Sequence, residues 1–194
     1  RGLGDVYKRQ GSAGEEVAQA NGFKTVAVGS QANALMEVDA GTADAAIIDL
    51  LMAGAMVGEG TSYPDLKVTE QKLNSELYGV GCRKGSDLTS FINSVMSAAY
   101  ADGTMVELAK TYGVQESLLE QPACEFTAAE SDSDVQYIQD KGKLIVGITE
   151  FAPMDYQDAN GQWIGFDADM AKLVAEKLGV EVEFQIINWD MKVE

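Results

Sequence analysis

Short apolar runs that suit β-strands alternate with amphipathic segments that suit helices through most of this chain of 194 residues. Residues 43–48 form a compact apolar run typical of a buried parallel strand, and further strands are expected at 67–69 and 76–83. The clearest helix is predicted over 88–99, where apolar residues recur at the helical repeat: Leu88, Phe91, Ile92, Val95, Met96 and Ala99. Strands that alternate with helices predict an α/β fold with doubly wound, mostly parallel sheets.

Composition excludes several classes of chemistry. The chain has no histidine, which removes Ser-His and Cys-His triads and zinc sites that contain histidine. Its formal net charge of −17 argues against nucleic acid and anionic membrane surfaces as partners. The two cysteines, Cys82 and Cys124, stand in unlike contexts and form no CxxC motif, so no disulfide framework is visible. The longest apolar stretch, 43–58, is interrupted by acidic residues and is too short to span a bilayer.

The chain divides into four parts by composition. Residues 1–10 (RGLGDVYKRQ) carry three of the fourteen basic residues and match nothing in the pattern that follows, so we expect a foreign or artefactual start. Residues 11–120 form a first α/β stretch. Residues 121–139 contain no Lys or Arg and predict an acidic linker, and residues 140–194 begin a second α/β stretch. The last residues stop without a helix cap or turn, so both ends are expected to be truncated.

Four ordered motifs stand in the last stretch: Lys143-Leu-Ile-Val-Gly147, Phe151-Ala-Pro153-Met154, Asn160-Gly161-Gln-Trp-Ile-Gly165-Phe166-Asp167 and Lys177-Leu178-Gly179-Val180. A helix is predicted to start at Gly165 with one apolar face formed by Phe166, Met170, Leu173, Val174 and Leu178. Together these motifs resemble the opening of the type II periplasmic-binding-protein fold, in the amino-acid group of ABC-transporter solute receptors (solute-binding protein family 3).

The first stretch resembles the later half of the same family. The segments that carry this resemblance occur in the family's order: Gly11-Ser12-Ala13-Gly14-Glu15, Ala40-Gly41-Thr-Ala-Asp44-Ala45-Ala-Ile-Ile-Asp49, Glu76-Leu-Tyr78-Gly79-Val-Gly81-Cys-Arg83-Lys84-Gly85 and Asp102-Gly103-Thr104. The resemblance implies that 11–120 supply the second lobe and the returning helices of the first lobe, which 140–194 begin. The late half therefore precedes the early half. Two explanations remain open: a fragment across two tandem copies, or a circular permutant joined through 121–139.

The resemblance also implies where a ligand binds between two closing lobes. Ser12 and Glu15 have the spacing of a capping box, and the free amides at such a helix start attract a carboxylate. Gly11, Ser12 and Ala13 are accordingly assigned to the ligand's carboxylate, although a plain helix cap gives the same pattern. Asp49 follows the apolar run, at the strand end where open α/β sheets bind ligands. The family uses this position for the ligand's ammonium, and the alternative is an N-cap for the helix that follows.

Two aromatic residues of the last stretch complete the expected site. Phe151 and Trp189 match positions where aromatic or apolar side chains cover the ligand, and a role in the core is the alternative for both. Ile148 stands where the family usually has an acidic residue three positions before that aromatic, which weakens any ammonium contact in this lobe.

The resemblance implies extracytoplasmic binding of an amino acid or similar small polar solute, delivered to the membrane permease of an ABC transporter. The expected location is periplasmic or anchored at the cell surface as a lipoprotein. No catalytic residue, cofactor or metal is expected, so we do not predict an enzyme. An alternative is the ligand-sensing outer domain of a membrane signalling protein. A dehydratase-like enzyme on the same fold would require a positioned acid and base, and the carboxylates here are scattered.

Overall fold

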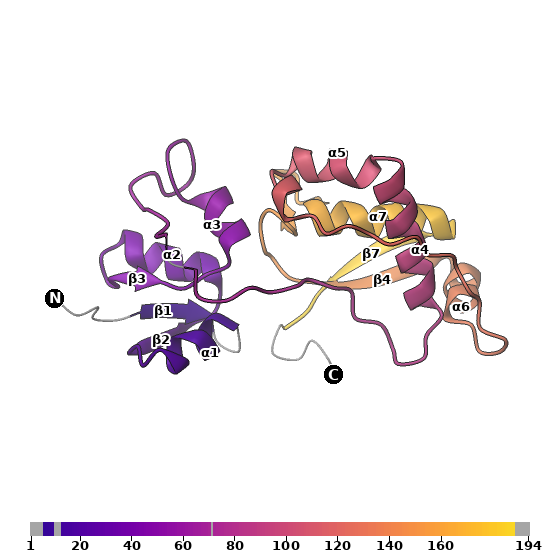
Figure 1. The fold of residues 1–194 in the computed structure, drawn as a ribbon, viewed down its shortest axis with the longest axis horizontal. Helices are drawn as coiled ribbons and strands as arrows, with labels where there is room; N and C mark the ends of the chain where they lie inside the picture. The colour runs from indigo at the N-terminus through magenta and orange to yellow at the C-terminus, as the bar shows by residue number, and fades with distance from the viewer. Residues whose placement is uncertain (1–5, 10–12, 71, 189–194) are drawn as a thin grey trace. The chain divides into compact units, whose positions relative to one another are not determined.

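The computed structural model describes residues 6–9, 13–70 and 72–188 (Figure 1). The chain divides into two compact units, Arg1–Tyr78 and Gly79–Glu194. Both units combine helices with parallel strands, which confirms the predicted α/β class.

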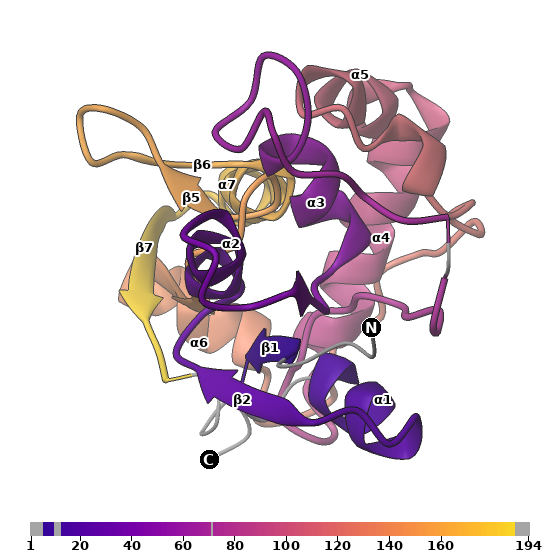
Figure 2. The same cartoon turned by 90° about the vertical axis from the view of Figure 1, so that its left-hand side faces the viewer.

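The first unit is built around a parallel sheet with strand order β2-β1-β3. Helices α1 and α2 lie on opposite sides of this sheet (Figure 1 and Figure 2), as doubly wound connections require. The elements along the chain are β1 (Val6–Arg9), α1 (Ala13–Ala20), β2 (Thr25–Val28), α2 (Gln31–Asp39), β3 (Ala45–Ala46) and α3 (Leu50–Met56).

The start of the chain contributes a strand that the sequence pattern did not indicate. The foreign or artefactual origin expected for residues 1–10 stays a prediction, and within them Val6–Arg9 form the central strand of the first unit. Val6 pairs with Thr25 of β2 on one side and with Ala45 of β3 on the other. Val and Tyr are good strand formers, and β2 and β3 both require a parallel neighbour to satisfy their backbone groups.

The strands expected at 67–69 and 76–83 are absent from the described residues. Leu77 and Val80 are exposed, although Cys82 near the end of this stretch packs against the core of the second unit. Gly79 and Gly81 lower its strand propensity further. This part of the chain runs from α3 to the second unit without a strand partner to pair with.

The second unit joins a parallel strand pair to several helices. Strands β4 (Lys143–Ile148) and β7 (Glu181–Ile186) pair in parallel and are connected through α7 (Phe166–Leu178). A small antiparallel hairpin of β5 (Tyr156–Gln157) and β6 (Trp163–Ile164) precedes α7. The remaining elements are α4 (Leu88–Ala101), α5 (Thr104–Thr111), η1 (Gln115–Ser117) and α6 (Asp134–Lys141).

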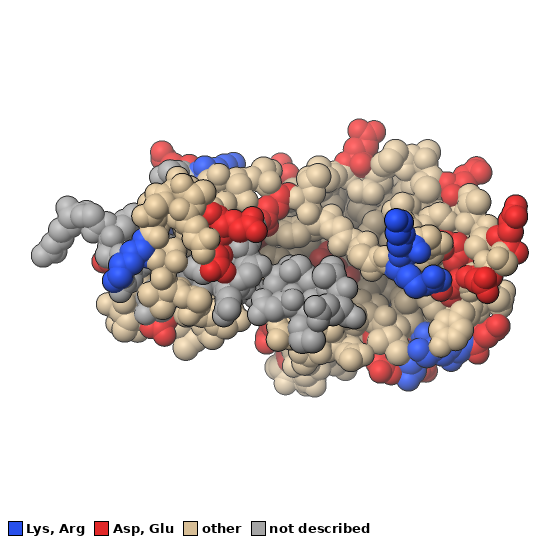
Figure 3. Space-filling view, turned by 90° about the horizontal axis from the view of Figure 1, so that it is seen from below, with Lys and Arg blue, Asp and Glu red and all other residues tan. Residues whose placement is uncertain are grey.

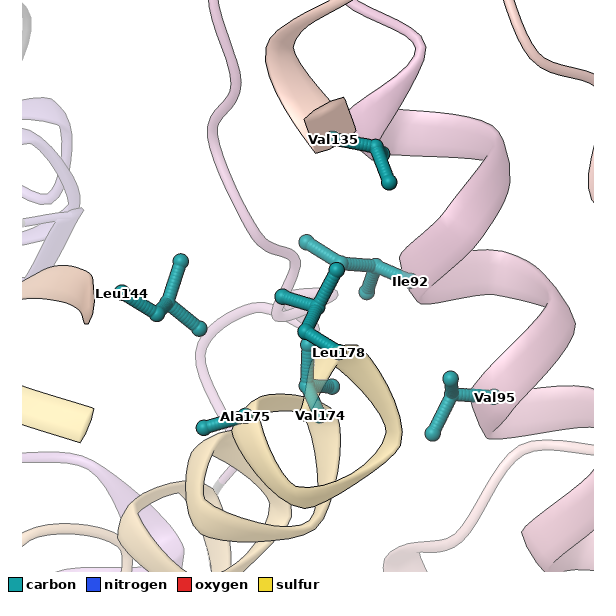
Figure 4. Close-up of a cluster of buried hydrophobic side chains, with 7 residues drawn as sticks. All are labelled: Ile92, Val95, Val135, Leu144, Val174, Ala175 and Leu178. Carbon is teal, nitrogen blue, oxygen red and sulfur yellow. The ribbon is translucent and has the colours of Figure 1, made fainter. Parts of the chain in front are cut away.

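One hydrophobic core ties the early and late parts of this unit together (Figure 4). Four elements, α4, α6, β4 and α7, contribute its buried side chains: Ile92, Val95, Val135, Leu144, Val174, Ala175 and Leu178. Each large aliphatic side chain that leaves water here stabilises the unit by about 1.5–3 kcal/mol. Helix α4, which the sequence resemblance assigned to a late half, therefore shares a core with the strands and helix assigned to an early half.

Residues 121–139 were predicted to be an acidic linker with little burial. Most of them are exposed, but the segment still bonds to helix α4. The segment 124–133, which we name the α4 strap, runs along helix α4. The Cys124 amide donates to Ser97 Oγ at 3.2 Å, Ser90 Oγ donates to the Thr127 carbonyl at 2.9 Å, and Phe126 meets Phe91 edge to face. Helix α6 then begins at Asp134. Hydroxyl groups on α4 form hydrogen bonds with backbone groups of the strap. A hydrophobic pattern in the sequence does not reveal bonds of this kind.

Candidate ligand-binding site

Asp49 stands where β3 turns into α3 in the first unit. Its Oδ1 accepts hydrogen bonds from the amides of Leu51 at 2.7 Å and Met52 at 3.3 Å. Its own amide donates to Gln31 Oε1 at 2.6 Å. Asp49 is therefore the N-cap of α3, as one reading of the sequence predicted. Its role toward a ligand stays a prediction.

The second carboxylate oxygen of Asp49 has a different partner. The hydroxyl of Tyr78 donates a hydrogen bond to Asp49 Oδ2. The two oxygens are thus divided, one facing the helix start and the other facing a side chain that is 47% exposed. Sequence reasoning missed Tyr78, although it lies inside the quoted segment 76–85. The expected strand there gave no reason to turn this side chain toward a residue 29 positions earlier.

The residues assigned to the ligand's carboxylate are only partly described. Gly11 and Ser12 lie outside the described residues, and Ala13 is the first residue of α1. The helix begins where the predicted capping box would start it. The predicted contacts of Gly11, Ser12 and Ala13 with a carboxylate stay predictions.

Phe151 belongs to the second unit, just beyond β4. Its amide donates to the Asp155 carbonyl at 2.5 Å, and its carbonyl accepts from the Met154 amide at 2.9 Å, so the turn that carries it is closed by backbone bonds. Its side chain is half-buried. Trp189 lies outside the described residues. The predicted covering of a ligand by Phe151 and Trp189 therefore stays a prediction.

Two carboxyl groups missed by the sequence reasoning lie close to this turn. Burial raises the pKa of Asp167, in the first turn of α7, to about 6. Burial, together with the negative charge of Asp167, raises the pKa of Asp155 to about 7. The pair can therefore hold a proton near neutral pH. Both positions fall inside or beside the quoted motifs, but nothing in a linear pattern indicates their mutual burial.

The raised pKa values predict a pH-dependent stability. Because these carboxyls bind protons more tightly when folded, their stabilising contribution is complete below about pH 4 and is lost as pH rises through 6 and 7. We expect Asp155→Asn to raise the free energy of unfolding by about 1–2 kcal/mol at pH 8 and by little at pH 5. This value lies well below the full linkage value because the group still meets water. Urea unfolding at the two pH values measures it.

An exposed carboxylate provides the control for this prediction. Asp65→Asn in the first unit removes one negative charge from an exposed position and should change stability little at either pH. Equal stabilisation by Asp155→Asn at pH 5 and pH 8 would contradict the prediction, since it would mean that packing rather than charge is responsible.

A neighbouring polar cluster has a structural role. Asp169 of α7 accepts a hydrogen bond from the Tyr112 hydroxyl at 2.5 Å. It also forms an ion pair with Lys172 at 2.7 Å. Lys172 also donates to the Trp163 carbonyl at 2.6 Å. Burial, followed by the bond to Asp169, raises the pKa of Tyr112 to about 12. Every member has a partner, so the cluster holds the hairpin strand β6 and the residue after α5 against α7.

The acidic charge of the chain is dispersed. Asp and Glu side chains are scattered over both units on the face shown in Figure 3. Such a distribution is typical of a solvated surface rather than of a dedicated cation site. Within the part of the chain that the structure describes, no helix combines the length and apolar character needed to cross a membrane.

Comparison with known proteins finds relatives that match part of the chain. A protein of Haemophilus influenzae described as a probable amino-acid ABC transporter-binding protein is 47% identical over 49 residues, which are 24% of this chain and 19% of that protein. An ancestral cationic amino acid solute-binding protein is 45% identical, with 30% of this chain and 26% of that chain covered and a TM-score of 0.29. The L-cystine solute receptor of Neisseria gonorrhoeae is also 45% identical, with 30% and 25% covered and a TM-score of 0.27.

These TM-scores are too low to compare overall folds. The matches cover between a fifth and about a quarter of the relatives' own length. The family match, however, falls on the stretch that carries the four ordered motifs. Residues 144–194 match the family of bacterial extracellular solute-binding proteins, family 3.

Proposed function

We propose that the protein containing this chain binds an amino acid or similar small polar solute outside the cytoplasm and delivers it to the permease of an ABC transporter. The family that matches residues 144–194 and the relative described as an amino-acid ABC transporter-binding protein support this assignment. The observation at the site that most supports the proposal concerns the two carboxylate oxygens of Asp49: one caps helix α3, and the other points away from the helix start.

Asp49 suits an α-ammonium group for two reasons. The amides of Leu51 and Met52 fix Oδ1, so the carboxylate has one orientation before any ligand arrives. Oδ2 then accepts a hydrogen bond from outside the helix, where a charged donor contributes about 1.5–3 kcal/mol. Asp49 also follows strand β3, at the end of the strand where ligands of open α/β sheets bind.

The proposal is a binding function rather than an enzyme. Solute recognition requires polar groups held in position, without a general acid and base. The chain has no histidine to fill the usual base role. In this proposal Gly11, Ser12 and Ala13 bind the solute's carboxylate, Asp49 binds its ammonium, and Phe151 and Trp189 cover it.

Asp49→Asn tests the proposed ammonium contact. Asn keeps an oxygen that can cap α3, so the fold is expected to persist while the negative charge is lost. We expect binding of the responsive amino acids to weaken about tenfold, near the lower end of a lost charged hydrogen bond. The measurement is an NMR titration of the chain against the common amino acids, monitored at the amides of Leu51 and Met52, which donate to Asp49.

Asp39→Ala is the matched control, because Asp39 is an exposed carboxylate at the end of α2 in the same unit. Its titration curves should match those of the parent chain. Affinity that is unchanged in Asp49→Asn would remove Asp49 from the binding site. A panel in which no amino acid moves the two amide signals would contradict the proposed function itself.

A further inference from the structure

We infer that the Tyr78 hydroxyl competes with the ligand's ammonium for Oδ2 of Asp49, so that Tyr78 limits the affinity of the site. The inference rests on the proposed function, because it assigns a second residue to the same ammonium contact. It starts from one observation: the outward oxygen of Asp49 accepts a hydrogen bond from the Tyr78 hydroxyl.

Tyr78 is not required to orient Asp49. The cap bonds from Leu51 and Met52 hold Oδ1, and the Asp49 amide is held by Gln31 Oε1 at 2.6 Å. The carboxylate therefore keeps its direction when the phenol leaves. A hydroxyl that does not position the acceptor but occupies its outward oxygen acts as a competitor for that oxygen.

The segment around Tyr78 favours exchange. Among the described residues between α3 and α4 there is no helix and no paired strand, apart from the single bridge between Val57 and Tyr63. Leu77, Tyr78 and Val80 are 79%, 47% and 58% exposed. A phenol that is about half exposed can exchange its carboxylate bond for a bond to water without leaving a buried polar group unpaired.

Competition of this kind has a defined chemical signature. Binding through Oδ2 succeeds only while the phenol is away, so the apparent affinity falls in proportion to the fraction of chains in which Asp49 is free. The reduction applies to solutes that present an ammonium group to Asp49. A solute with the same carbon chain and no ammonium does not compete with Tyr78 for this oxygen.

Tyr78→Phe removes the competing hydroxyl and keeps the ring. NMR titrations of the parent chain and the variant with L-alanine and L-arginine, monitored at the Leu51 and Met52 amides, should show about five- to tenfold tighter binding in the variant. Propionate, which is alanine without its ammonium, should show less than about a twofold change by the same reasoning. Tyr63→Phe, another hydroxyl removal in the first unit, should leave both affinities at the parent value.

The outcomes separate this inference from the proposed function. Unchanged or weaker amino-acid binding in Tyr78→Phe, with Asp49→Asn still weakening it, overturns the competition and leaves Asp49 as the site. An equal gain for propionate also overturns it, because ammonium competition cannot produce that result. If neither amino acid moves the two amide signals in any variant, the proposed function fails and the competition fails with it.

Discussion

Replacing Asp87 with alanine is expected to lower the free energy of unfolding of the second unit by about 3 kcal/mol. Asp87 is only 7% exposed. Its carboxylate accepts hydrogen bonds from the Ala129 amide at 3.1 Å, the Ser133 hydroxyl at 2.5 Å and the Val135 amide at 3.1 Å. Alanine leaves three donors without their acceptor and detaches both the α4 strap and the start of α6 from helix α4.

The effect of this substitution should depend on pH. Burial alone would raise the pKa of Asp87, but the hydrogen bonds from Ser133, Ala129 and Val135 outweigh it and lower the pKa below its usual value. The stabilisation is therefore present above about pH 4 and is lost as pH falls through the lower pKa of the folded state. Asp155 and Asp167 respond in the opposite sense, so the second unit should be most stable in mildly acidic solution.

Urea unfolding at pH 7 and limited proteolysis of the α4 strap together test the role of Asp87. Glu130→Ala is the control, because it removes an exposed carboxylate from the same strap and should cost less than about 0.5 kcal/mol. The Asp87 variant should also be cleaved within 124–133 before the parent chain is. Parental stability together with a parental cleavage pattern would mean that other contacts hold the strap.

The helices of the second unit show what a sequence pattern can predict. The apolar repeat in 88–99 predicted α4, and Ile92 and Val95 from that repeat are buried in the core. The predicted apolar face of α7 is likewise confirmed at Met170, Val174 and Leu178. An amphipathic repeat identifies the buried side of a helix without knowledge of its partner, because the pattern depends only on the helical period.

The α4 strap shows where such patterns fail. Its acidic composition and lack of an apolar period predicted a linker. Hydrogen bonds hold the strap in place: its backbone groups bond to the hydroxyls of Ser90 and Ser97 and to the buried carboxylate of Asp87. A backbone amide is present at almost every residue, so its partner cannot be read from composition.

The candidate site likewise contains one residue that the sequence pattern predicts and one that it does not. Asp49 was predictable, because an acidic residue between an apolar run and a helix fits both a cap and the ligand end of a strand. Tyr78 was not predictable, because its bond to Asp49 depends on the path of a long segment without regular structure. The central strand β1 was missed because four residues of mixed polarity give too short a pattern to separate strand from tail.

Replacing Gly165 with alanine is expected to destabilise the second unit by about 3 kcal/mol or more. Gly165 has φ +123°, a conformation that side chains rarely adopt. A Cβ atom there would lie 2.2 Å from the Met154 carbonyl oxygen and 2.9 Å from the Asp155 nitrogen, so the backbone itself must move. That close approach is held by the Phe166 amide, which donates to the Pro153 carbonyl at 3.1 Å, and by the Asp167 amide, which donates to the Met154 carbonyl at 2.9 Å.

Gly161→Ala separates the two sources of this cost. Gly161 also has a positive φ, +76°, but no atom lies within 4 Å of the position that its Cβ would take. Alanine at Gly161 therefore carries only the conformational penalty, about 1 kcal/mol. Urea unfolding of both variants measures the difference, which belongs to the contact between the start of α7 and the turn 153–155. Equal losses would show that the start of α7 and the turn 153–155 are not in close contact. The burial that raises the pKa values of Asp155 and Asp167 would then also be weaker.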